Sequence, residues 1–181
     1  MTVHSTGLLV LGSGIAGQTT ATAAAESGIE VILAEKTDSL GGSTVMSGGW
    51  FAYSGTVEQR ARGIEDSDDL FLSDMLEAGE HRNDPALLRA YLDHQLEAYS
   101  WLKEHGVNFG EVEISAGQST KRSHHSPIVE VMKSLHEQFQ AAGGTTLLKH
   151  RAARLLTDGQ GKVTGARLIS PDGEVDFLAS H

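Results

Sequence analysis

The chain has 181 residues, enough for a domain with a sizeable hydrophobic core. Its 14 basic and 24 acidic side chains give a formal net charge of −10, which argues against nucleic-acid binding because that binding relies on neutralising phosphates. The absence of cysteine excludes disulfides, iron–sulfur clusters and thiolate zinc sites. No apolar run approaches the roughly 18 residues of a membrane span, and residues 1–7 lack the pattern of a signal peptide. We therefore expect a cytoplasmic protein.

The N-terminal stretch has the pattern of a strand, a glycine-rich turn, a helix and a second strand. The apolar run at 8–11 is typical of a buried parallel strand, and an alanine-rich helix is expected over 15–27. A second apolar strand is expected over 29–34 and ends at Glu35. The turn between the first strand and the helix has the G-x-G-x-x-G pattern and consists of Gly12, Ser13, Gly14, Ile15, Ala16 and Gly17.

Each part of this stretch fits the recognition of a dinucleotide. Gly12 permits a tight turn, Gly14 lets the backbone approach a pyrophosphate, and Gly17 allows close packing of helix and strand. The helix N-terminus attracts phosphate through its unpaired N–H groups. Glu35 lies about 20 residues further on, where an acid accepts hydrogen bonds from ribose hydroxyls. A glycine-rich turn without a ligand is the alternative, and from these residues alone the ligand is either NAD or FAD.

Helical spacing predicts three more helices, over about 68–78, 85–105 and 127–142. Asp84 is expected to cap the second of them, with Pro85 at its first position. We expect residues 60–142 to form a helical insertion, with one short strand near 112–114.

The C-terminal part reads as a β-meander over about 145–180. Residues 145–157 form one or two strands with a kink near 150–153, and two more strands follow turn signals at 162–170 and 174–179. The fold class is therefore α/β: a Rossmann-like βαβ domain with a C-terminal β-meander.

One short segment concentrates basic side chains in this acidic protein: Lys121, Arg122, His124 and His125. They could hold an anionic substrate or a phosphate, but we favour a solvated, charged loop. A zinc site is not expected, because no pair of histidines four residues apart with a nearby acid falls on a predicted helix.

Beyond these local patterns, the chain resembles the flavoprotein subunit family of fumarate reductases and succinate dehydrogenases. The soluble branch, with flavocytochrome-type fumarate reductases, urocanate reductases and ketosteroid dehydrogenases, is the most similar. The resemblance covers nearly the whole chain and implies that the dinucleotide is FAD. It rests on an ordered series of motifs: GSGIAG (12–17), EK (35–36), GGST (41–44), SGG (47–49), NDPAL (83–87) and KRSHHSP (121–127).

The resemblance implies a role for each motif in holding FAD. The backbone N–H groups of Ser13 and Gly14 would meet the pyrophosphate, and Glu35 would bind the adenosine ribose with Lys36 beside it. The GGST loop would reach the pyrophosphate and ribityl chain, the SGG motif would lie against the isoalloxazine, and the backbone of Ala152 would pair with adenine. The implied cofactor-binding residues are Gly12, Ser13, Gly14, Ile15, Ala16, Gly17, Glu35, Lys36, Gly41, Gly42, Ser43, Thr44, Ser47, Gly48, Gly49 and Ala152.

The resemblance also implies an activity. The chain would be the FAD-binding portion of an oxidoreductase acting on a carbon–carbon double bond next to an electron-withdrawing group, in a small substrate such as a carboxylate or a ketosteroid. No histidine lies between His4 and His81, so the flavin is expected to be noncovalent. The electron donor stays open. A catalytically silent nucleotide-binding module and an NAD-binding domain are the alternatives.

The sequence departs from the family pattern in two places. The glycine-rich insert usual after KRSHHSP is absent. The strand that completes the FAD sheet, the capping domain and the C-terminal return are also absent, so we expect an N-terminal part whose catalytic residues lie outside this chain. Alone, it is expected to bind FAD weakly, to lack reductase turnover and to self-associate.

Overall fold

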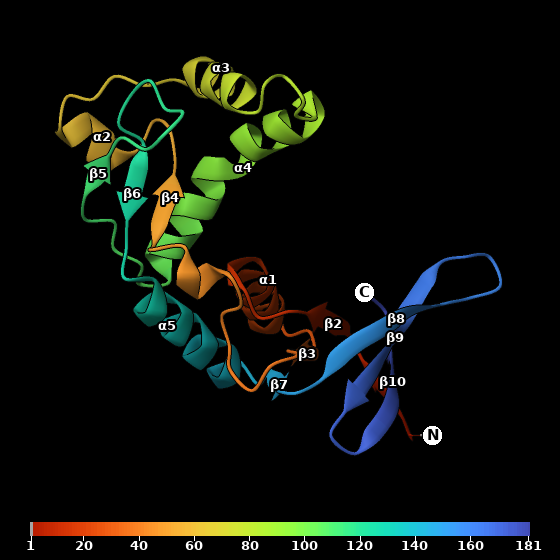
Figure 1. The fold of residues 1–181 in the computed structure, drawn as a ribbon. Coiled ribbons are helices and arrows are strands. Elements are labelled where there is room, and N and C mark those ends of the chain that lie inside the picture. Colours follow the sequence, from red (N-terminus) through yellow and green to blue (C-terminus); the bar gives the residue numbers. More distant parts are fainter. Residues whose placement is uncertain (1) are drawn as a thin grey trace. The chain divides into compact units, whose positions relative to one another are not determined.

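The computed structural model describes residues 2–181, which form two compact units (Figure 1). The first unit combines residues 2–47 with 128–181, and the second is Gly48–Pro127. The expected insertion over 60–142 overlaps the second unit but differs from it at both ends. Residues 48–59 belong to the second unit, and residues 128–142 belong to the first.

The first unit contains the predicted βαβ motif. Strands β2 (Leu8–Leu11), β3 (Val31–Ala34) and β7 (Thr145–Leu147) form a parallel sheet in the order β2-β3-β7. Helix α1 (Ile15–Glu26) connects the first two strands. Strand β3 begins two residues later than expected, because the N–H groups of Gly28 and Ile29 complete the C-terminal end of the helix by donating to carbonyls of its last turn.

Both faces of the parallel sheet are covered, as its all-apolar strands require. On one face, Leu33 joins a buried cluster with Phe139 of helix α5 (Ile128–Ala141), which packs against α1. On the other face, Ile32 packs against a second cluster that includes Phe177. Alternate residues of one strand therefore face two different layers.

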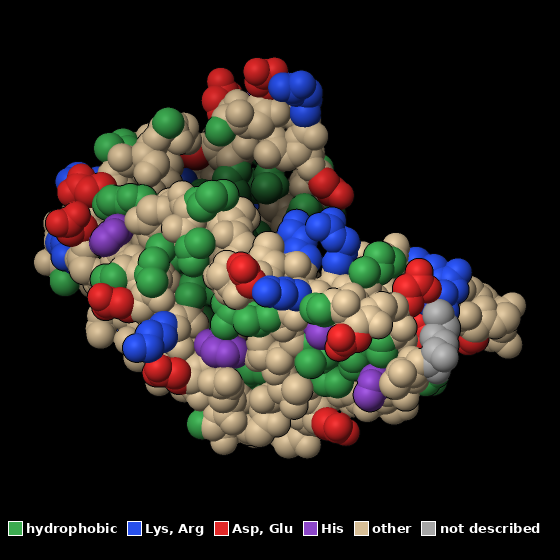
Figure 2. Space-filling model, turned by 60° about the horizontal axis from the view of Figure 1, so that its bottom comes forward, with side chains coloured by type: hydrophobic (Ala, Val, Ile, Leu, Met, Phe, Trp, Pro, Cys, Tyr) green, Lys and Arg blue, Asp and Glu red, His purple; other side chains and the backbone are tan. Residues whose placement is uncertain are grey.

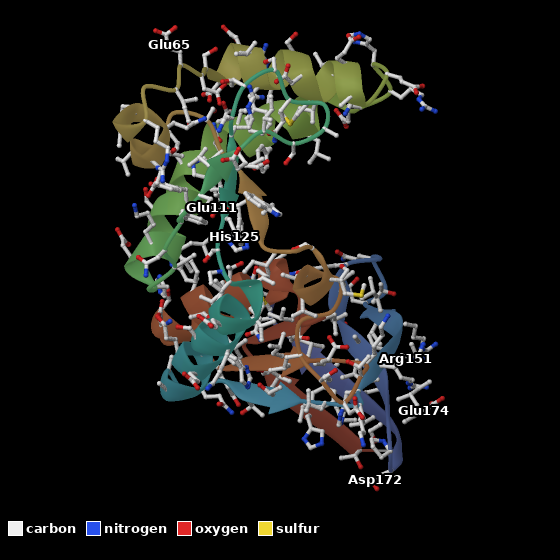
Figure 3. All side chains as sticks on the ribbon, turned by 60° about the vertical axis from the view of Figure 1, so that its left-hand side comes forward. Glu65, Glu111, His125, Arg151, Asp172 and Glu174 are labelled. Carbon is white, nitrogen blue, oxygen red and sulfur yellow. The ribbon has the colours of Figure 1, made fainter. Side chains whose placement is uncertain are left out.

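The second layer is a four-stranded sheet in the order β1-β10-β9-β8. Its strands are β1 (Thr2–Thr6), β10 (Gly173–Ala179), β9 (Val163–Ser170) and β8 (Arg151–Thr157). The last three strands form the predicted meander. Arg151, Asp172 and Glu174, which are labelled in Figure 3, belong to it.

Residues 145–157 were expected to form one or two strands of the meander, with a kink near 150–153. Two strands are present, and the expectation was wrong only about the sheet of the first: β7 joins the parallel sheet, β8 joins the meander, and residues 148–150 pass between the two sheets. Strand β1 was not expected, because its sequence TVHST is mostly polar, and it pairs in parallel with β10.

The second unit pairs three short strands with three helices. Strands β4 (Trp50–Ala52), β6 (Ser123–His125) and β5 (Val112–Glu113) form an antiparallel sheet in that order. The helices are α2 (Val57–Ala61), α3 (Asp68–Ala78) and α4 (Pro85–Glu104). Asp84 caps α4 by accepting the N–H of Ala86 at 2.9 Å, which confirms the sequence prediction.

Acidic and basic side chains are interspersed on the face shown in Figure 2. Within residues 2–181, none of the helices combines the length and the apolar character that crossing a membrane requires.

Candidate functional site

The turn between β2 and α1 has a shape that only glycine allows at two positions. Gly12 has a φ of +99°, in the left-handed region that other residues rarely adopt. A Cβ on Gly17 would lie 1.9 Å from the carbonyl oxygen of Gly12, so a larger residue would push the helix away from the strand. The sequence predicted both roles from spacing alone.

The N-terminus of α1 forms the floor of a cradle for an anion. Its first turn contains no acidic residue of its own. A carboxylate from another strand, that of Glu35, accepts the N–H of Ser13 directly before the helix at 3.0 Å. The N–H of Ile15 donates to the Thr44 hydroxyl at 3.0 Å, and a Cβ on Gly14 would lie 3.2 Å from the same oxygen. Thr44 therefore lies directly over the helix end, where the backbone is left open by Gly14.

The glycine loop that carries Thr44 is also held in a shape that requires glycine. Gly41 has a φ of +110°, and a Cβ there would meet the side chain of Val45 at 2.4 Å. Gly42 has a φ of +51°. The loop then turns into the short 3-10 helix η1 (Thr44–Met46).

Glu35, at the end of β3, is clamped by four donors. One carboxylate oxygen accepts the Ser13 N–H at 3.0 Å and the Ser13 hydroxyl at 2.7 Å. The other accepts the Thr37 N–H at 2.9 Å and the Thr37 hydroxyl at 3.0 Å. Burial by itself would raise the pKa of Glu35, but these hydrogen bonds outweigh it and lower the pKa to about 2.

Ser13 has a different role from the one the resemblance implied. Its N–H was expected to meet a pyrophosphate, but it donates to Glu35, and the residue is fully buried. The turn directs this N–H to the Glu35 carboxylate at the end of β3. Ser13 contributes to the site through Glu35.

Thr37 was missed by the sequence reasoning. It donates through both its N–H and its hydroxyl to Glu35. A hydroxyl residue two positions after an acid at a strand end was the available signal, since such residues form local turns with a carboxylate acceptor.

The structure brings only part of the predicted set together. Hydrogen bonds join the glycine turn at 12–17, Glu35 and the loop from Gly41 to Thr44: Ser13 donates to Glu35, Ile15 donates to Thr44, and the N–H of Gly41 donates to the Ser13 hydroxyl. Lys36 and Ser47 are exposed in the same unit. Ala152 is exposed on the outer strand β8, beside an irregularity in its register.

The SGG motif is divided between the two units. Gly48 and Gly49 belong to the second unit and have φ values of +73° and +78°. The carbonyl of Gly49 accepts the N–H of Ser126 at 2.9 Å, so this glycine pair is anchored to the end of the KRSHHSP segment.

We favoured a solvated, charged loop for the segment with Lys121, Arg122, His124 and His125, and this expectation was wrong for Arg122. The Arg122 side chain is fully buried and forms ion pairs with Asp66 and Asp74, both at 2.9 Å. Its guanidinium also lies 4.4 Å from the ring centroid of Phe71. An unpaired buried guanidinium would be very costly, so the two acids of the same unit accompany it into the interior.

His124 is likewise buried and engaged within the protein. Its Nδ1 lies 2.8 Å from the carbonyl oxygen of Arg122, which can only accept, so Nδ1 carries the proton. Its Nε2 lies 2.7 Å from the Thr56 hydroxyl. Burial lowers the pKa of His124, so the ring is neutral at physiological pH. His125 is half-buried, with its ring 4.9 Å from that of Trp50.

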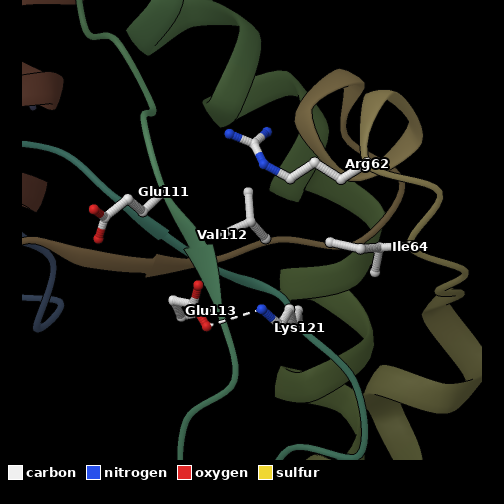
Figure 4. Close-up of a pocket in the computed structure, with 6 residues that line it drawn as sticks. All are labelled: Arg62, Ile64, Glu111, Val112, Glu113 and Lys121. Atoms are coloured by element: carbon white, nitrogen blue, oxygen red, sulfur yellow. Dashed lines mark hydrogen bonds and ion pairs between the residues drawn. The ribbon is translucent and has the colours of Figure 1, made fainter.

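Lys121 borders a pocket of about 340 Å³ in the second unit (Figure 4). Its ammonium group forms an ion pair with Glu113 at 3.0 Å. Arg62 lines the same pocket and donates to the carbonyl of Gly110 at 2.7 Å. Figure 3 labels Glu111, another lining residue, on the same unit. The charged groups of the pocket are thus partly engaged with one another and with the backbone.

The cradle in the first unit defines a class of protein. A glycine turn at a strand end, a helix N-terminus with no acid in its own first turn, and a buried acid at the end of the next strand are the parts of a dinucleotide-binding domain. The residues present fit a bound dinucleotide, because Gly14 leaves room over the helix end and Glu35 is held ionised beside it.

Comparison with known proteins gives the family. Residues 7–181 match the model of the FAD binding domain, so the chain belongs to that family and its cofactor is FAD. It is 30% identical over 173 residues to the NADH:fumarate oxidoreductase of Klebsiella pneumoniae, which covers 93% of this chain and 19% of that protein.

Two solved structures show the same fold. One is the open conformation of a flavocytochrome c3 fumarate reductase, with a TM-score of 0.91, 28% identity, and coverage of 97% of this chain and 32% of that one. The other is the 3-ketosteroid-Δ4-(5α)-dehydrogenase of Rhodococcus jostii, with a TM-score of 0.85, 26% identity, and coverage of 97% and 44%. Several curated relatives match about nine-tenths of this chain. The chain spans only about a fifth to a third of the length of those relatives.

Proposed function

We propose that this chain is the FAD-binding portion of an oxidoreductase that transfers hydride between the flavin and a carbon–carbon double bond next to an electron-withdrawing group. The observation that carries the proposal is the cradle: the helix end under Thr44, together with the clamped carboxylate of Glu35. Membership of the FAD binding domain family supports FAD over NAD and supports an enzyme over a catalytically silent module.

In this proposal each part of the cradle has one task. The N-terminus of α1 and the hydroxyl of Thr44 hold the pyrophosphate, and Gly14 lets it approach the backbone. Glu35 accepts hydrogen bonds from the ribose hydroxyls, and it is ionised because its pKa is about 2. The Gly48–Gly49 pair lies against the flavin ring, and the backbone of Ala152 pairs with adenine. Bound FAD supplies the hydride chemistry, while these residues bind and orient it.

The substrate is proposed to be a small molecule, either a carboxylate or a ketosteroid. The relatives support this range, because one is named for fumarate and another for a 3-ketosteroid. The catalytic acid is proposed to lie outside these 181 residues. Arg122 and His124, two candidates of the KRSHHSP segment, are fully buried and bound to partners of their own unit, which supports that view.

The flavin is proposed to be bound noncovalently and the protein to be cytoplasmic. The absence of histidine between His4 and His81 supports noncovalent binding, since a histidine near the glycine pair is the site of covalent attachment in the membrane-bound branch. Precipitation of the flavin-loaded protein with acid should release all of the yellow colour. Colour that stays with the pellet would contradict the proposal.

The binding site can be tested by titrating the purified chain with FAD and following the flavin absorption and fluorescence. Gly14→Val should abolish binding, because its side chain would fill the space between the helix end and Thr44. Gly159→Val is the matched control, since a Cβ at Gly159 meets nothing within 4 Å and the residue lies in a distant turn. Equal FAD binding by both variants would contradict the site.

The location of the catalytic acid can be tested with the same protein. The flavin-loaded chain is expected to show no turnover of fumarate with reduced viologen as the electron donor. Turnover by the 181-residue chain would place the acid within it, and Arg122→Met and His124→Gln would then have to be examined as its carriers.

A further inference from the structure

The Ser13 side chain links the two halves of the cradle through a pair of hydrogen bonds. Its Oγ accepts the N–H of Gly41 at 3.1 Å and donates to a carboxylate oxygen of Glu35 at 2.7 Å. Gly41 opens the loop that carries Thr44, and Glu35 ends strand β3. A single hydroxyl thus connects the group proposed to bind ribose with the loop proposed to bind pyrophosphate.

The direction of both hydrogen bonds is fixed by chemistry. A backbone N–H can only donate, and an ionised carboxylate can only accept, so the one proton of Ser13 must point to Glu35. The pKa of Glu35 lies far below neutral, which keeps this polarity at physiological pH. Ser13 is fully buried, so water does not compete for either bond.

The loop itself leaves few alternative conformations. Gly41 has a φ of +110°, and a Cβ on this residue would lie 2.4 Å from the side chain of Val45. The far end of the loop is tied to the same turn, because Thr44 accepts the N–H of Ile15 at 3.0 Å. The loop is therefore held at both ends by the β2–α1 turn, and its first attachment depends on Ser13.

We propose that Ser13 is a positioning residue that couples Glu35 to the Gly41–Thr44 loop, so that the ribose and pyrophosphate of an ADP-containing cofactor are recognised cooperatively. This inference rests on the proposed function, because it assigns the cradle to FAD. When ribose hydroxyls bind Glu35, they take the place of donors from the exposed Thr37, while the carboxylate keeps its bond to the buried Ser13 and the loop is held in the shape that receives the phosphates. Without the Ser13 hydroxyl the two parts bind independently.

The first test needs no cofactor. In the 15N-labelled chain, Ser13→Ala should shift the amide resonance of Gly41 and raise its hydrogen-exchange rate by about ten-fold or more, since a buried hydrogen bond is lost. Glu35→Gln should also shift the Gly41 resonance, but only while Ser13 is present. Ser39→Ala, which removes an exposed hydroxyl two residues before Gly41, is the control and should leave Gly41 unchanged.

The second test measures coupling in the dissociation constants for ADP and FAD. The two substitutions Glu35→Gln and Thr44→Val are made singly and together, first in the parent chain and then in the Ser13→Ala variant. With Ser13 present, the effects of the two substitutions should deviate from additivity by about five-fold or more, as is usual for residues of one network. With Ser13→Ala they should add to within about two-fold. Ser13→Cys, which keeps the size but weakens both bonds, should give an intermediate result and guards against misfolding of the alanine variant.

The outcomes separate this inference from the proposed function. If neither ADP nor FAD binds, the proposed function fails. The Gly41 resonance then still shows whether the Ser13 hydroxyl links Glu35 to Gly41. If FAD binds but Glu35→Gln and Thr44→Val are additive with Ser13 present, the coupling is refuted. A Gly41 resonance that does not respond to Ser13→Ala would refute the link between Ser13 and Gly41 itself.

Discussion

The buried carboxylate of Glu35 should make the stability of the protein depend on pH in a defined range. The pKa of this group falls from 4.5 to about 2 because its hydrogen bonds from Ser13 and Thr37 outweigh the effect of burial. The folded state therefore holds the proton less tightly than the unfolded state. The stabilisation is fully present above about pH 4.5 and is lost as the pH falls toward about 2.

The size of this effect follows from the difference between the two values. Between 4.5 and about 2, at about 1.4 kcal/mol for each pH unit, Glu35 contributes about 3 kcal/mol to the free energy of unfolding at neutral pH. Near pH 3 the contribution should be only about 1–1.5 kcal/mol. Glu35 is only 4% exposed, so screening by solvent does not greatly weaken this contribution to stability.

Glu35→Gln provides the matching perturbation. The amide resembles the protonated acid in charge, and its NH₂ group would face one of the two pairs of donors that now point at the carboxylate. We expect the variant to be about 3 kcal/mol less stable than the parent near neutral pH, with the difference shrinking as the pH falls. Glu30→Gln, at an exposed position just before the same strand, should change stability by less than about 0.5 kcal/mol.

The assay is urea unfolding followed by far-ultraviolet circular dichroism at several pH values between about 7 and 3. The decisive quantity is the difference in the free energy of unfolding between the parent and Glu35→Gln at each pH. A difference that stays constant over this range would refute the reasoning, because it would mean that the charge of Glu35 does not carry the stabilisation.

Three further results are expected. Glu35→Gln should weaken FAD binding by roughly ten-fold or more, since hydrogen bonds to a charged group contribute about 1.5–3 kcal/mol, and an unchanged dissociation constant would remove the acid from the ribose site. Gly17→Ala should destabilise the first unit by about 1–3 kcal/mol and weaken FAD binding, because its Cβ would collide with the Gly12 carbonyl; unaltered thermal unfolding would contradict this. Arg122→Met should cost about 3–5 kcal/mol by leaving two aspartates unpaired, whereas Lys121→Met at a half-exposed ion pair should cost less than about 1 kcal/mol. Tryptophan fluorescence reports this last comparison because both tryptophans lie in the second unit, and equal losses for the two variants would contradict it.

The sequence alone determined the βαβ motif and the acid at its end. Strand, turn, helix and second strand follow one another within about 30 residues, so each is specified by local periodicity and by glycines at fixed offsets. The same holds for the cap of α4 at Asp84, which is a contact between neighbours in the chain. These features depend on few distant contacts, and the structure confirms them.

Only the tertiary structure decided which groups meet across longer distances. Ser13 and Glu35 are 22 residues apart, and Arg122 and Asp66 are 56 apart, so neither pairing is visible as a pattern. A polar run such as KRSHH has the same composition whether it is solvated or buried, and its burial depends on acids supplied by another element. Likewise, the division of residues 145–157 between two sheets depends on the strands beside them, because β-strands acquire their partners from elsewhere in the chain.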